Sequence, residues 1–330
     1  MTLLIESAGP AVSVQDAGRP GGLGLGLSRS GAVDREGYLA ALALADAPIG
    51  AAAIEMAGFG GRFRFNSACR FALTGAQMRA SLDGAPLLWG GAHWAEAGAL
   101  LNIGAAETGV YGYLLPGGGV SSKPELGGRG FHRIAGLGQP LVAGDDLPFA
   151  RSPDLPAMKL TARPPETGPI RVMPGPQTPL FAEEALARFE ATDFTRSAKA
   201  NRQGVRLDQN GAPFSAGSQL QQVSDFIAEG DIQMTGDGTP YVLLADCQTM
   251  GGYPRIGTVL PGDLPRIAQS VPGQSIRFRF VTVAEAEALW TSDATRLKRL
   301  KALVAPLVRD PRDIPDLLSY DLVGKPILPE

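Results

Sequence analysis

Short apolar runs separated by turn residues dominate the pattern of hydrophobic and polar positions along the chain. Residues 62–65 and 275–280 alternate polar with apolar side chains, which predicts strands that bury one face. The frequent turn signals indicate many short strands and few helices. The other strands are predicted at residues 3–6, 11–14, 70–74, 78–82, 100–103, 109–115, 170–173, 232–234 and 241–245.

Helices are predicted from capping residues and composition. Asp34 precedes an Ala/Leu-rich run at 35–47 and is a suitable N-cap, because its carboxylate can accept hydrogen bonds from first-turn N–H groups. A second helix is predicted at 182–189. Thr282 is the expected N-cap of a closing helix that reaches about residue 303, with acidic residues early and basic residues late, as the helix dipole favours.

The length of the chain, 330 residues, predicts two packed units rather than one core. Apolar residues make up 44% and charged residues 19%, which excludes a disordered chain, and the 43 glycines and 27 prolines agree with many turns. The sequence PPETGP at 164–169 predicts a linker. We therefore expect domains at 1–163 and 164–283, followed by a closing helix and a proline-rich tail at 284–330.

Charge and hydropathy limit the partners and the compartment. The net charge of −3 and the isoelectric point near 5.6 predict no attraction to nucleic acid or to an anionic membrane. The N-terminus lacks the basic region of a signal peptide, and no apolar run approaches the roughly 20 residues that span a bilayer. Cys69 and Cys247 lie in or beside apolar runs, which predicts buried thiols in a reducing compartment. We expect a cytoplasmic protein.

Several common catalytic motifs are absent from the sequence. It has no Walker A loop, no G-x-G-x-x-G placed between a strand and a helix, no G-x-S-x-G elbow, no HExxH and no CxxC. His93 and His132 are the two histidines and are interpreted as structural, so neither a zinc site nor a Ser/His/Asp triad is expected. An enzyme of this composition would work through hydrogen bonds, carboxylates and guanidinium groups.

A polar turn after the apolar run at 241–245 is the leading candidate for a functional site. Residues 246–257 present an acid, an amide, a hydroxyl, a phenol and a guanidinium. Two glycines allow positive φ or a close approach of the backbone to a ligand, and a proline restricts the residue before it to extended conformations. Gln248 and Tyr253 could donate hydrogen bonds to a developing oxyanion. The alternative is an ordinary Gly-Pro hairpin that carries polar residues.

Two further segments carry candidate binding groups. The run 195–207 contains four basic residues and no acid, which suits a carboxylate or phosphate, although a solvated basic face is the alternative. Near the N-terminus, Asp16 could orient Arg19 or accept a proton, or the two residues could only stabilise their loop. Ser30 and Asp34 have a simpler interpretation as the start of a helix.

Four segments in the same order resemble one protein family. They are VQDAGRPG with SGAVD at 14–34, LLPGGG with LGGR at 114–129, NRQGVRL at 201–207 and QTMGGYPRI at 248–256. On these motifs the chain is similar to the allophanate hydrolase subunit 2 family, or biotin-dependent carboxyltransferase-like proteins. Its members include the C subunit of bacterial 5-oxoprolinase and half of the carboxyltransferase domain of urea carboxylase. The resemblance spans residues 3 to 283, and it does not fix the reaction, because the family hosts several.

The resemblance implies a mainly β fold with a few helices, in which two cyclophilin-like β-barrel domains pack together. It also implies a site in which the catalytic residues are Asp16, Arg202, Gln248 and Tyr253. The residues expected to bind substrate are Gln15, Arg19, Ser30, Arg129, Lys199, Arg206, Gln233 and Thr249. No residue is expected to bind a metal.

Two family motifs are altered in this chain. Where members usually show LGSRST, the sequence reads LGGRGF, so hydroxyls are missing at Gly128 and Gly130. Where members usually show A-N-x-L-V-G-N, both asparagines are missing, near Leu42 and Ala47. These differences predict a divergent member of the family.

The resemblance implies a subunit-C-like component of an ATP-dependent 5-oxoprolinase, which opens a cyclic amide to glutamate. ATP would be a co-substrate in a site shared with a partner. The expected partners are a subunit-B-like protein of the allophanate hydrolase subunit 1 family and a lactam-utilisation-type A subunit. One alternative is biotin-dependent carboxyl transfer to a urea- or guanidine-like acceptor. Another is a non-catalytic protein that binds and regulates a partner, which the missing hydroxyls near Arg129 favour.

Overall fold

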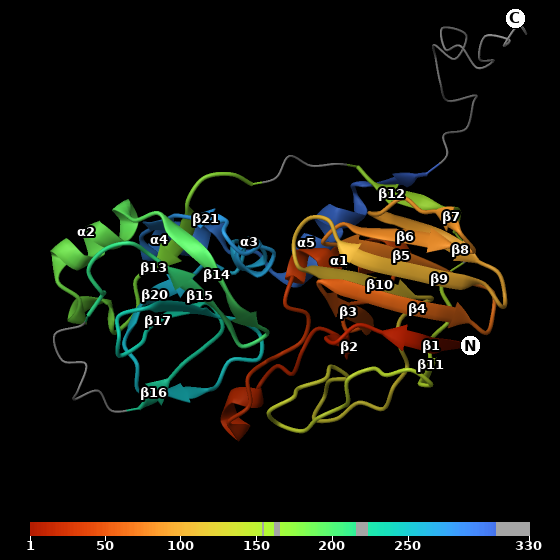
Figure 1. The fold of residues 1–330 in the computed structure, drawn as a ribbon, viewed down its shortest axis with the longest axis horizontal. Helices are drawn as coiled ribbons and strands as arrows, with labels where there is room; N and C mark the ends of the chain where they lie inside the picture. The colour runs from red at the N-terminus through yellow and green to blue at the C-terminus, as the bar shows by residue number, and fades with distance from the viewer. Residues whose placement is uncertain (154, 162–165, 216–223, 308–330) are drawn as a thin grey trace, which may run out of the picture.

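The chain forms two β-rich lobes that lie side by side along the longest axis of the molecule (Figure 1). The strands between residues 2 and 160 belong to the first lobe, and those between residues 170 and 280 to the second (Figure 1). The predicted mainly β fold with barrel-like sheets is confirmed. This computed structural model describes residues 1–153, 155–161, 166–215 and 224–307.

Two sheets build the first lobe, and their facing side chains form its core. The strands are β1 Thr2–Ala8, β2 Val12–Gln15, β3 Ala53–Ala57, β4 Phe59–Phe65, β5 Cys69–Gly75, β6 Met78–Leu82, β7 Ala85–Pro86, β8 Gly91–Ala95, β9 Leu100–Ala106, β10 Tyr111–Pro116, β11 Asp146–Pro148 and β12 Met158–Leu160. One sheet has the order β11-β1-β4-β9-β6-β7, and the other begins β2-β3-β10-β5-β8-β12. The alternation predicted for β4 is present, because Phe63 and Phe65 are buried and Phe65 packs on Phe71 of the facing sheet.

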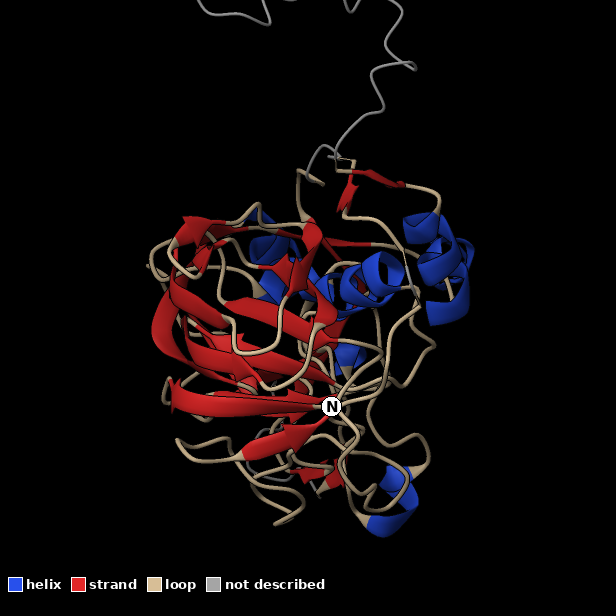
Figure 2. Ribbon diagram, turned by 90° about the vertical axis from the view of Figure 1, so that its right-hand side faces the viewer, coloured by secondary structure: helices blue, strands red, loops and turns tan. Residues whose placement is uncertain are grey.

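Helix α1 (Arg35–Ala45) covers the outer face of the second of these sheets. It begins after Asp34, whose carboxylate accepts a hydrogen bond from the N–H of Gly37 at 3.0 Å, so the predicted N-cap is present. It ends at Asp46, which has the left-handed φ of 50°. Figure 2 shows the strands gathered on one side of the molecule and most of the helices on the other.

The second lobe is a barrel. Its sheet contains β13 Ile170–Met173, β14 Phe194–Asn201, β15 Gly204–Asp208, β17 Asp231–Met234, β18 Pro240–Leu243, β20 Arg255–Val259, β21 Ser275–Ile276 and β22 Phe278–Phe280. Although β21 and β22 are consecutive in the chain, they lie at opposite ends of the order β21-β14-β15-β18-β17-β20-β13-β22. The run 275–280 therefore pairs with both edges and closes the sheet. The single strand predicted there is two short strands, because its halves pair with different neighbours on either side of Arg277.

Aromatic side chains fill the core of this barrel. Helix α2 (Glu183–Ala191) supplies Phe189, which is fully buried and contacts four further phenylalanine rings at centroid distances of 5.1, 5.7, 5.0 and 6.0 Å, those of Phe194, Phe214, Phe278 and Phe280. The remaining elements are the short helix α3 Leu264–Ala268, the 3₁₀ turns η1 Gly22–Leu25 and η2 Thr178–Leu180, and the two-stranded pair β16 Asp225–Phe226 and β19 Met250–Gly251.

Two helices, α4 (Val283–Leu289) and α5 (Asp293–Lys301), stand where the sequence predicts one closing helix. Thr282 caps α4 as predicted, through a reciprocal capping box. The chain then becomes extended at Trp290, with φ −65° and ψ 136°, and Ser292 caps α5. A second capping residue so soon after the first explains why the helical pattern is interrupted.

The C-terminal part of the described chain returns to the first lobe. Asp293 of α5 pairs with Arg35 of α1 at 2.8 Å, and strand β23 (Val304–Pro306) adds to β12 at the end of the sheet that α1 covers. The proline-rich tail after residue 307 and part of the predicted linker lie outside the described residues. The domain boundaries at 163 and 283 stay a prediction.

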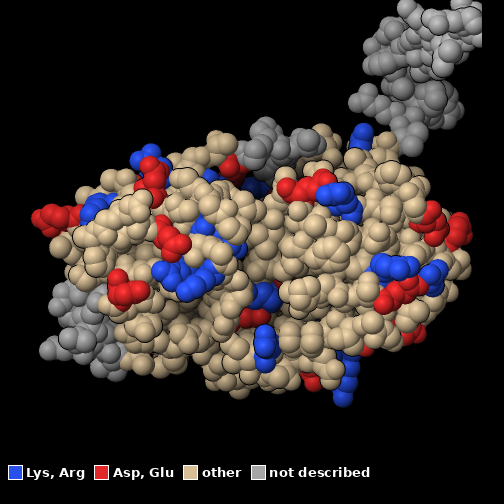
Figure 3. Space-filling model, viewed as in Figure 1, with Lys and Arg blue, Asp and Glu red and all other residues tan. Residues whose placement is uncertain are grey.

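Charged side chains are sparse on the face shown in Figure 3, and several lie along the boundary between the lobes. Cys69 and Cys247 are free and buried, and burial raises the pKa of both thiols to about 12, so they stay protonated at neutral pH. Within the described ranges, no helix combines the length and apolar character needed to cross a membrane.

Replacing Asp34 with serine tests its buried charge while keeping a capping side chain. Burial raises the pKa of Asp34 from 3.8 to about 6, so its ionisation is harder in the folded protein than in the unfolded chain. Its contribution to stability is complete below pH 3.8 and is lost as the pH rises through 6. Between about pH 4 and pH 7, wild type should lose about 3 kcal/mol of unfolding free energy relative to Asp34→Ser in urea titrations. A pH-independent difference would contradict this assignment.

Candidate functional site

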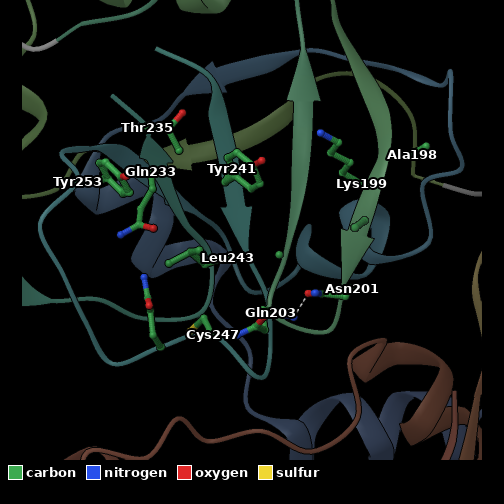
Figure 4. A pocket seen from close by; sticks show the side chains of 13 residues that line it. Ala198, Lys199, Asn201, Gln203, Gln233, Thr235, Tyr241, Leu243, Cys247 and Tyr253 are labelled. Atoms are coloured by element: carbon green, nitrogen blue, oxygen red, sulfur yellow. Dashed lines mark hydrogen bonds between the residues drawn. The ribbon is translucent and has the colours of Figure 1, made fainter. Parts of the chain in front are cut away.

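A cavity of about 520 Å³ opens on the second lobe, beside β14, β15, β17 and β18 and the polar turn that follows β18. Figure 4 shows Lys199 and Tyr253 on opposite sides of this cavity, with Tyr241 between them. Four of the residues predicted for the site come together here, namely Lys199, Gln233, Gln248 and Tyr253. The remaining lining residues are Ala198, Ala200, Asn201, Gln203, Gly204, Thr235, Tyr241, Leu243 and Cys247.

The alternation of the barrel strands decides which side chains reach the cavity. Ile232 and Met234 of β17 point into the apolar core, so Gln233 between them points to the opposite face. Val242 of β18 likewise belongs to the core, and its neighbour Tyr241 lines the cavity. The site is therefore built on the outer surface of rigid strands, and the turn supplies its remaining wall.

Gln233 is the most constrained polar group of the cavity. Its side chain is 4% exposed, and its Nε2 has no hydrogen-bond partner among the described residues. A Cβ at position 251 would lie 2.8 Å from this Nε2, so the glycine there lets the polar turn pass close over the amide. A buried amide donor without a partner is costly unless a ligand or water occupies the site.

The lining is rich in neutral hydrogen-bonding groups. Lys199 is the single charged side chain that the described residues contribute to it. Cys247 is neutral, because burial raises the pKa of its thiol. The amides are Asn201, Gln203, Gln233 and Gln248, and the phenols are Tyr241 and Tyr253. Such a lining can bind a small anion that also carries carbonyl and N–H groups. Asn201, Gln203 and Tyr241 were not among the predicted site residues, although Tyr241 begins the apolar run that precedes the predicted turn.

Arg202 lies outside this lining and joins the two lobes. Its Nε donates to Asp246 Oδ2 at 2.7 Å, and its Nη2 donates to Asp246 Oδ1 at 3.0 Å and to the carbonyl of Gly31 at 2.7 Å. Its Nη1 donates to Glu55 of β3 in the first lobe. Burial opposes the charge of Arg202, but Glu55 and Asp246 more than offset it and raise its pKa. These contacts engage every nitrogen of the guanidinium, and its predicted catalytic role stays untested.

Glu55 is a buried acid that was not among the predicted site residues. Its Oε2 accepts hydrogen bonds from the N–H of Val33 at 2.9 Å and from the hydroxyl of Tyr113 at 2.8 Å. Burial and the charge of Glu55 raise the pKa of Tyr113, so the phenol stays a donor. An acid within the apolar run of β3 was the signal in the sequence, since a buried carboxylate needs a cation and donors.

Asp16 and its neighbours form a separate group that holds two loops together. Asp16 accepts hydrogen bonds from the backbone N–H groups of Gly18 at 2.8 Å and Arg129 at 2.6 Å. Arg19 is 1% exposed and donates to the carbonyls of Glu125 at 3.0 Å and Gly130 at 2.7 Å. The structure does not bring Asp16, Arg19 or Arg129 to the cavity, and their contacts account for a role in loop structure.

The missing hydroxyls of the second motif have a steric explanation. A Cβ at position 128 would lie 2.9 Å from Cγ of Arg19, and one at position 130 would lie 2.7 Å from Oε1 of Gln15. Gln15 is buried, and its Nε2 donates to the carbonyl of Phe131 at 2.9 Å. Arg19 and Gln15 thus occupy the space into which side chains at Gly128 and Gly130 would project.

The last three predicted residues lie around the cavity or the lobe junction. Ser30 donates to Asp246 Oδ1 at 2.5 Å within the Arg202 group. Thr249 is buried and donates to the carbonyl of Gly26 at 3.1 Å. Arg206 lies across from Tyr241 in the sheet and pairs with Asp208 at 3.0 Å. Through these bonds, Ser30 and Thr249 help to join the lobes, and Arg206 does not.

Residues 25–280 match the family model described as the carboxyltransferase domain, subdomains A and B. The chain belongs to this family. The relatives include the C subunit of 5-oxoprolinase from Haemophilus influenzae, 30% identical over 299 residues that cover 88% of this chain and 95% of that protein. The same subunit of Escherichia coli is 31% identical over 289 residues, which cover 86% of this chain and 93% of the relative. The family predicted from the four motifs is confirmed.

The fold of the carboxyltransferase-family chain also occurs inside a larger protein. The crystal structure of Kluyveromyces lactis urea carboxylase matches with a TM-score of 0.80 at 22% identity, over 94% of this chain and 31% of that chain. At this identity the match shows the fold alone. In that protein the two lobes are one part of a chain with further segments.

Arg202→Met tests the junction between the lobes. The substitution leaves Glu55 and Asp246 buried without a cation, so we expect the protein to lose about 3–5 kcal/mol of unfolding free energy. Arg206→Met on the adjacent strand is the matched control, because its partner Asp208 is 48% exposed and the pair should contribute less than about 1 kcal/mol. Chemical denaturation of both variants gives the comparison, and equal losses would show that the Arg202 group does not hold the lobes.

Proposed function

We propose that this chain is the subunit-C-type component of an ATP-dependent 5-oxoprolinase and that the cavity beside β14 binds the cyclic amide. The observation that supports this is the lining, with one cation, four amides and two phenols among the described residues. The choice of substrate is supported by the similarity, over nearly their whole length, to two proteins named as the C subunit of 5-oxoprolinase. 5-Oxoproline carries the groups that this lining can recognise, namely a carboxylate, a ring carbonyl and a ring N–H.

The assignment of roles follows from the chemistry of each group. Lys199 pairs with the substrate carboxylate, as the charged residue of the lining. The free Nε2 of Gln233 donates to the ring carbonyl, and this interaction strengthens when attack of water turns the carbonyl oxygen into an oxyanion. Gln248 and Tyr253, both exposed on the turn, close over the ring and supply further donors. Arg202 acts as a positioning residue, because it binds Asp246 at the start of the turn that carries Gln248 and Tyr253.

Within the described part of the chain, the cavity lacks a group that can remove a proton from water. Its thirteen lining residues include no histidine and no carboxylate, and the Cys247 thiol is protonated. Ring opening needs water to add to the carbonyl carbon and the leaving nitrogen to gain a proton. We infer that a partner subunit, together with ATP, activates the amide or the water at this cavity.

Removing the donors should lower turnover in the assembled enzyme. In a complex reconstituted with the expected subunit-A-like and subunit-B-like partners, Gln233→Ala and Tyr253→Phe should reduce kcat/KM for 5-oxoproline, the first by about 10²-fold. The measurement is ADP release that depends on 5-oxoproline. Gln77→Ala is the matched control, because Gln77 is exposed on the first lobe.

Two results would contradict this proposal. One is wild-type kcat/KM in both cavity variants, which would move the site elsewhere. The other is ATP hydrolysis that does not respond to 5-oxoproline in a complex with all partners present, which would remove the assigned reaction.

Carboxyl transfer is the second candidate, and the description of the matching family as a carboxyltransferase domain favours it. The same amides and phenols could hold a urea- or guanidine-like acceptor while carboxybiotin delivers the carboxyl group. The two reactions differ in their requirements. Inhibition by avidin and dependence on bicarbonate would indicate carboxyl transfer, and insensitivity to both would indicate hydrolysis.

Assembly can be tested separately from chemistry. Because the described lining supplies donors but no base, the purified chain alone should show no 5-oxoproline-dependent ATP hydrolysis, and activity should appear when the subunit-A-like and subunit-B-like proteins are added. Size-exclusion chromatography at micromolar concentration should show this chain eluting together with the subunit-B-like protein. Full activity of the isolated chain, with the partner eluting separately, would refute the shared site.

A further inference from the structure

A second cavity lies at the junction of the lobes and differs from the first in its charges. It has a volume of about 330 Å³, which is within the range of small-molecule sites. Its walls are the segment from Arg29 to Arg35 of the first lobe, Glu229 before β17, and the start of α5. The first cavity has one charged side chain among its described lining residues, whereas this one has cations and carboxylates together.

Two of its charged side chains have no hydrogen-bond or ion-pair partner among the described residues. Arg296 of α5 and Glu229 form no hydrogen bond or ion pair there through their side chains, although both line the cavity. Arg29 and Arg35 share the carboxylate of Asp293, at 3.1 and 2.8 Å, which leaves that group with an excess positive charge. A ligand that satisfies this lining needs anionic oxygens for the guanidinium groups and hydrogen-bond donors for the carboxylate.

An aromatic side chain completes the lining. Trp290 is 64% exposed and lies at the extended break between α4 and α5. The break turns the indole out of the helical pattern and into the wall of the cavity. An exposed indole offers a flat face on which a planar ring can stack.

We propose that this cavity binds a nucleoside phosphate. The phosphate lies against Arg296 and the Arg29–Arg35 pair, a ribose hydroxyl donates to Glu229, and the base stacks on Trp290. Carboxylate recognition of ribose and guanidinium recognition of phosphate are both common in nucleotide sites. The claim that this cavity holds the ATP of the reaction rests on the proposed function. The claim that it binds a nucleoside phosphate does not.

Both cavities adjoin the same buried group, the one formed by Ser30, Asp246 and Arg202. Ser30 lines the second cavity and donates to Asp246, while Cys247, the residue that follows Asp246 in the chain, lines the first. Burial raises the pKa of Glu229, and the positive charges of Arg35 and Arg29 oppose that effect. Because Ser30 contacts Asp246, a nucleotide in the second cavity would lie next to the Asp246–Arg202 ion pair, which holds one wall of the first cavity.

Isothermal titration of the purified full-length chain tests the proposal without requiring turnover. The probes are ADP, ATP, adenosine and inorganic tripolyphosphate. We expect saturable binding of ADP or ATP, at least about tenfold tighter than binding of adenosine or tripolyphosphate, because the site recognises the phosphate and the nucleoside together. Arg296→Ala and Trp290→Ala should each weaken ADP binding about tenfold. Glu229→Gln should weaken it while leaving tripolyphosphate unaffected.

Two control variants keep the test specific. Lys298→Ala removes an exposed cation from the same helix outside the cavity, and Gln248→Ala alters the first cavity; both should leave ADP binding unchanged. Quenching of tryptophan fluorescence by ADP should disappear in Trp290→Phe. Circular dichroism confirms that each variant is folded.

Three results would overturn the proposal: no saturable binding of either nucleotide, equal affinity for tripolyphosphate and ATP, or unchanged ADP binding in both Arg296→Ala and Trp290→Ala. Nucleotide binding that obeys the predicted pattern, in a complex without 5-oxoproline-dependent ATP hydrolysis, would support this site and reject only the proposed reaction. Hydrolysis that persists while these variants bind ADP normally would reject only this site.

Discussion

The position of the two lobes depends on one buried cation, Arg202. It lies between Glu55 of the first lobe and Asp246 of the second, so two carboxylates share one guanidinium. The excess negative charge is tolerable because neutral donors surround it: the N–H of Val33 and the hydroxyls of Tyr113 and Ser30. A buried charge group of this kind is stable only when every member is present. The relative position of the lobes is therefore fixed by these ion pairs and hydrogen bonds as well as by the burial of apolar area.

The candidate cavity inherits its shape from the same contacts. Arg202 lies at the tip of the β14–β15 hairpin, whose strands form one wall, and Asp246 precedes the turn that forms the other. The backbone N–H of Asp246 also donates to the carbonyl of Arg202 at 2.9 Å. Both walls are thus tied to one point, and amides such as Gln233 and Gln248 are held at fixed separations. Preorganised donors of this kind are what a reaction through an oxyanion requires.

Local features of the fold could be predicted from the sequence, and long-range ones could not. The alternation of β4 and the caps Asp34 and Thr282 depend on neighbouring residues, so the pattern alone located them. The turn with Gln248 was found because its polar residues follow an apolar strand. The setting of Arg202 was not found, because Glu55 is 147 positions away along the chain and only the fold brings them together. The basic segment 195–207 was correctly identified as unusual, but the role of Arg202 within it depends on Glu55 and Asp246, which lie elsewhere in the chain.

The barrel of the second lobe has a consequence for how the protein is made. Its first strand, β13, pairs in parallel with its last, β22, and β21 pairs with β14. The sheet therefore closes only when residues 275–280 are in place. During synthesis the sheet stays open until residue 280 has left the ribosome. Strand β12 of the first lobe gains its partner β23 later still. The nascent chain therefore exposes unpaired strand edges through most of its translation.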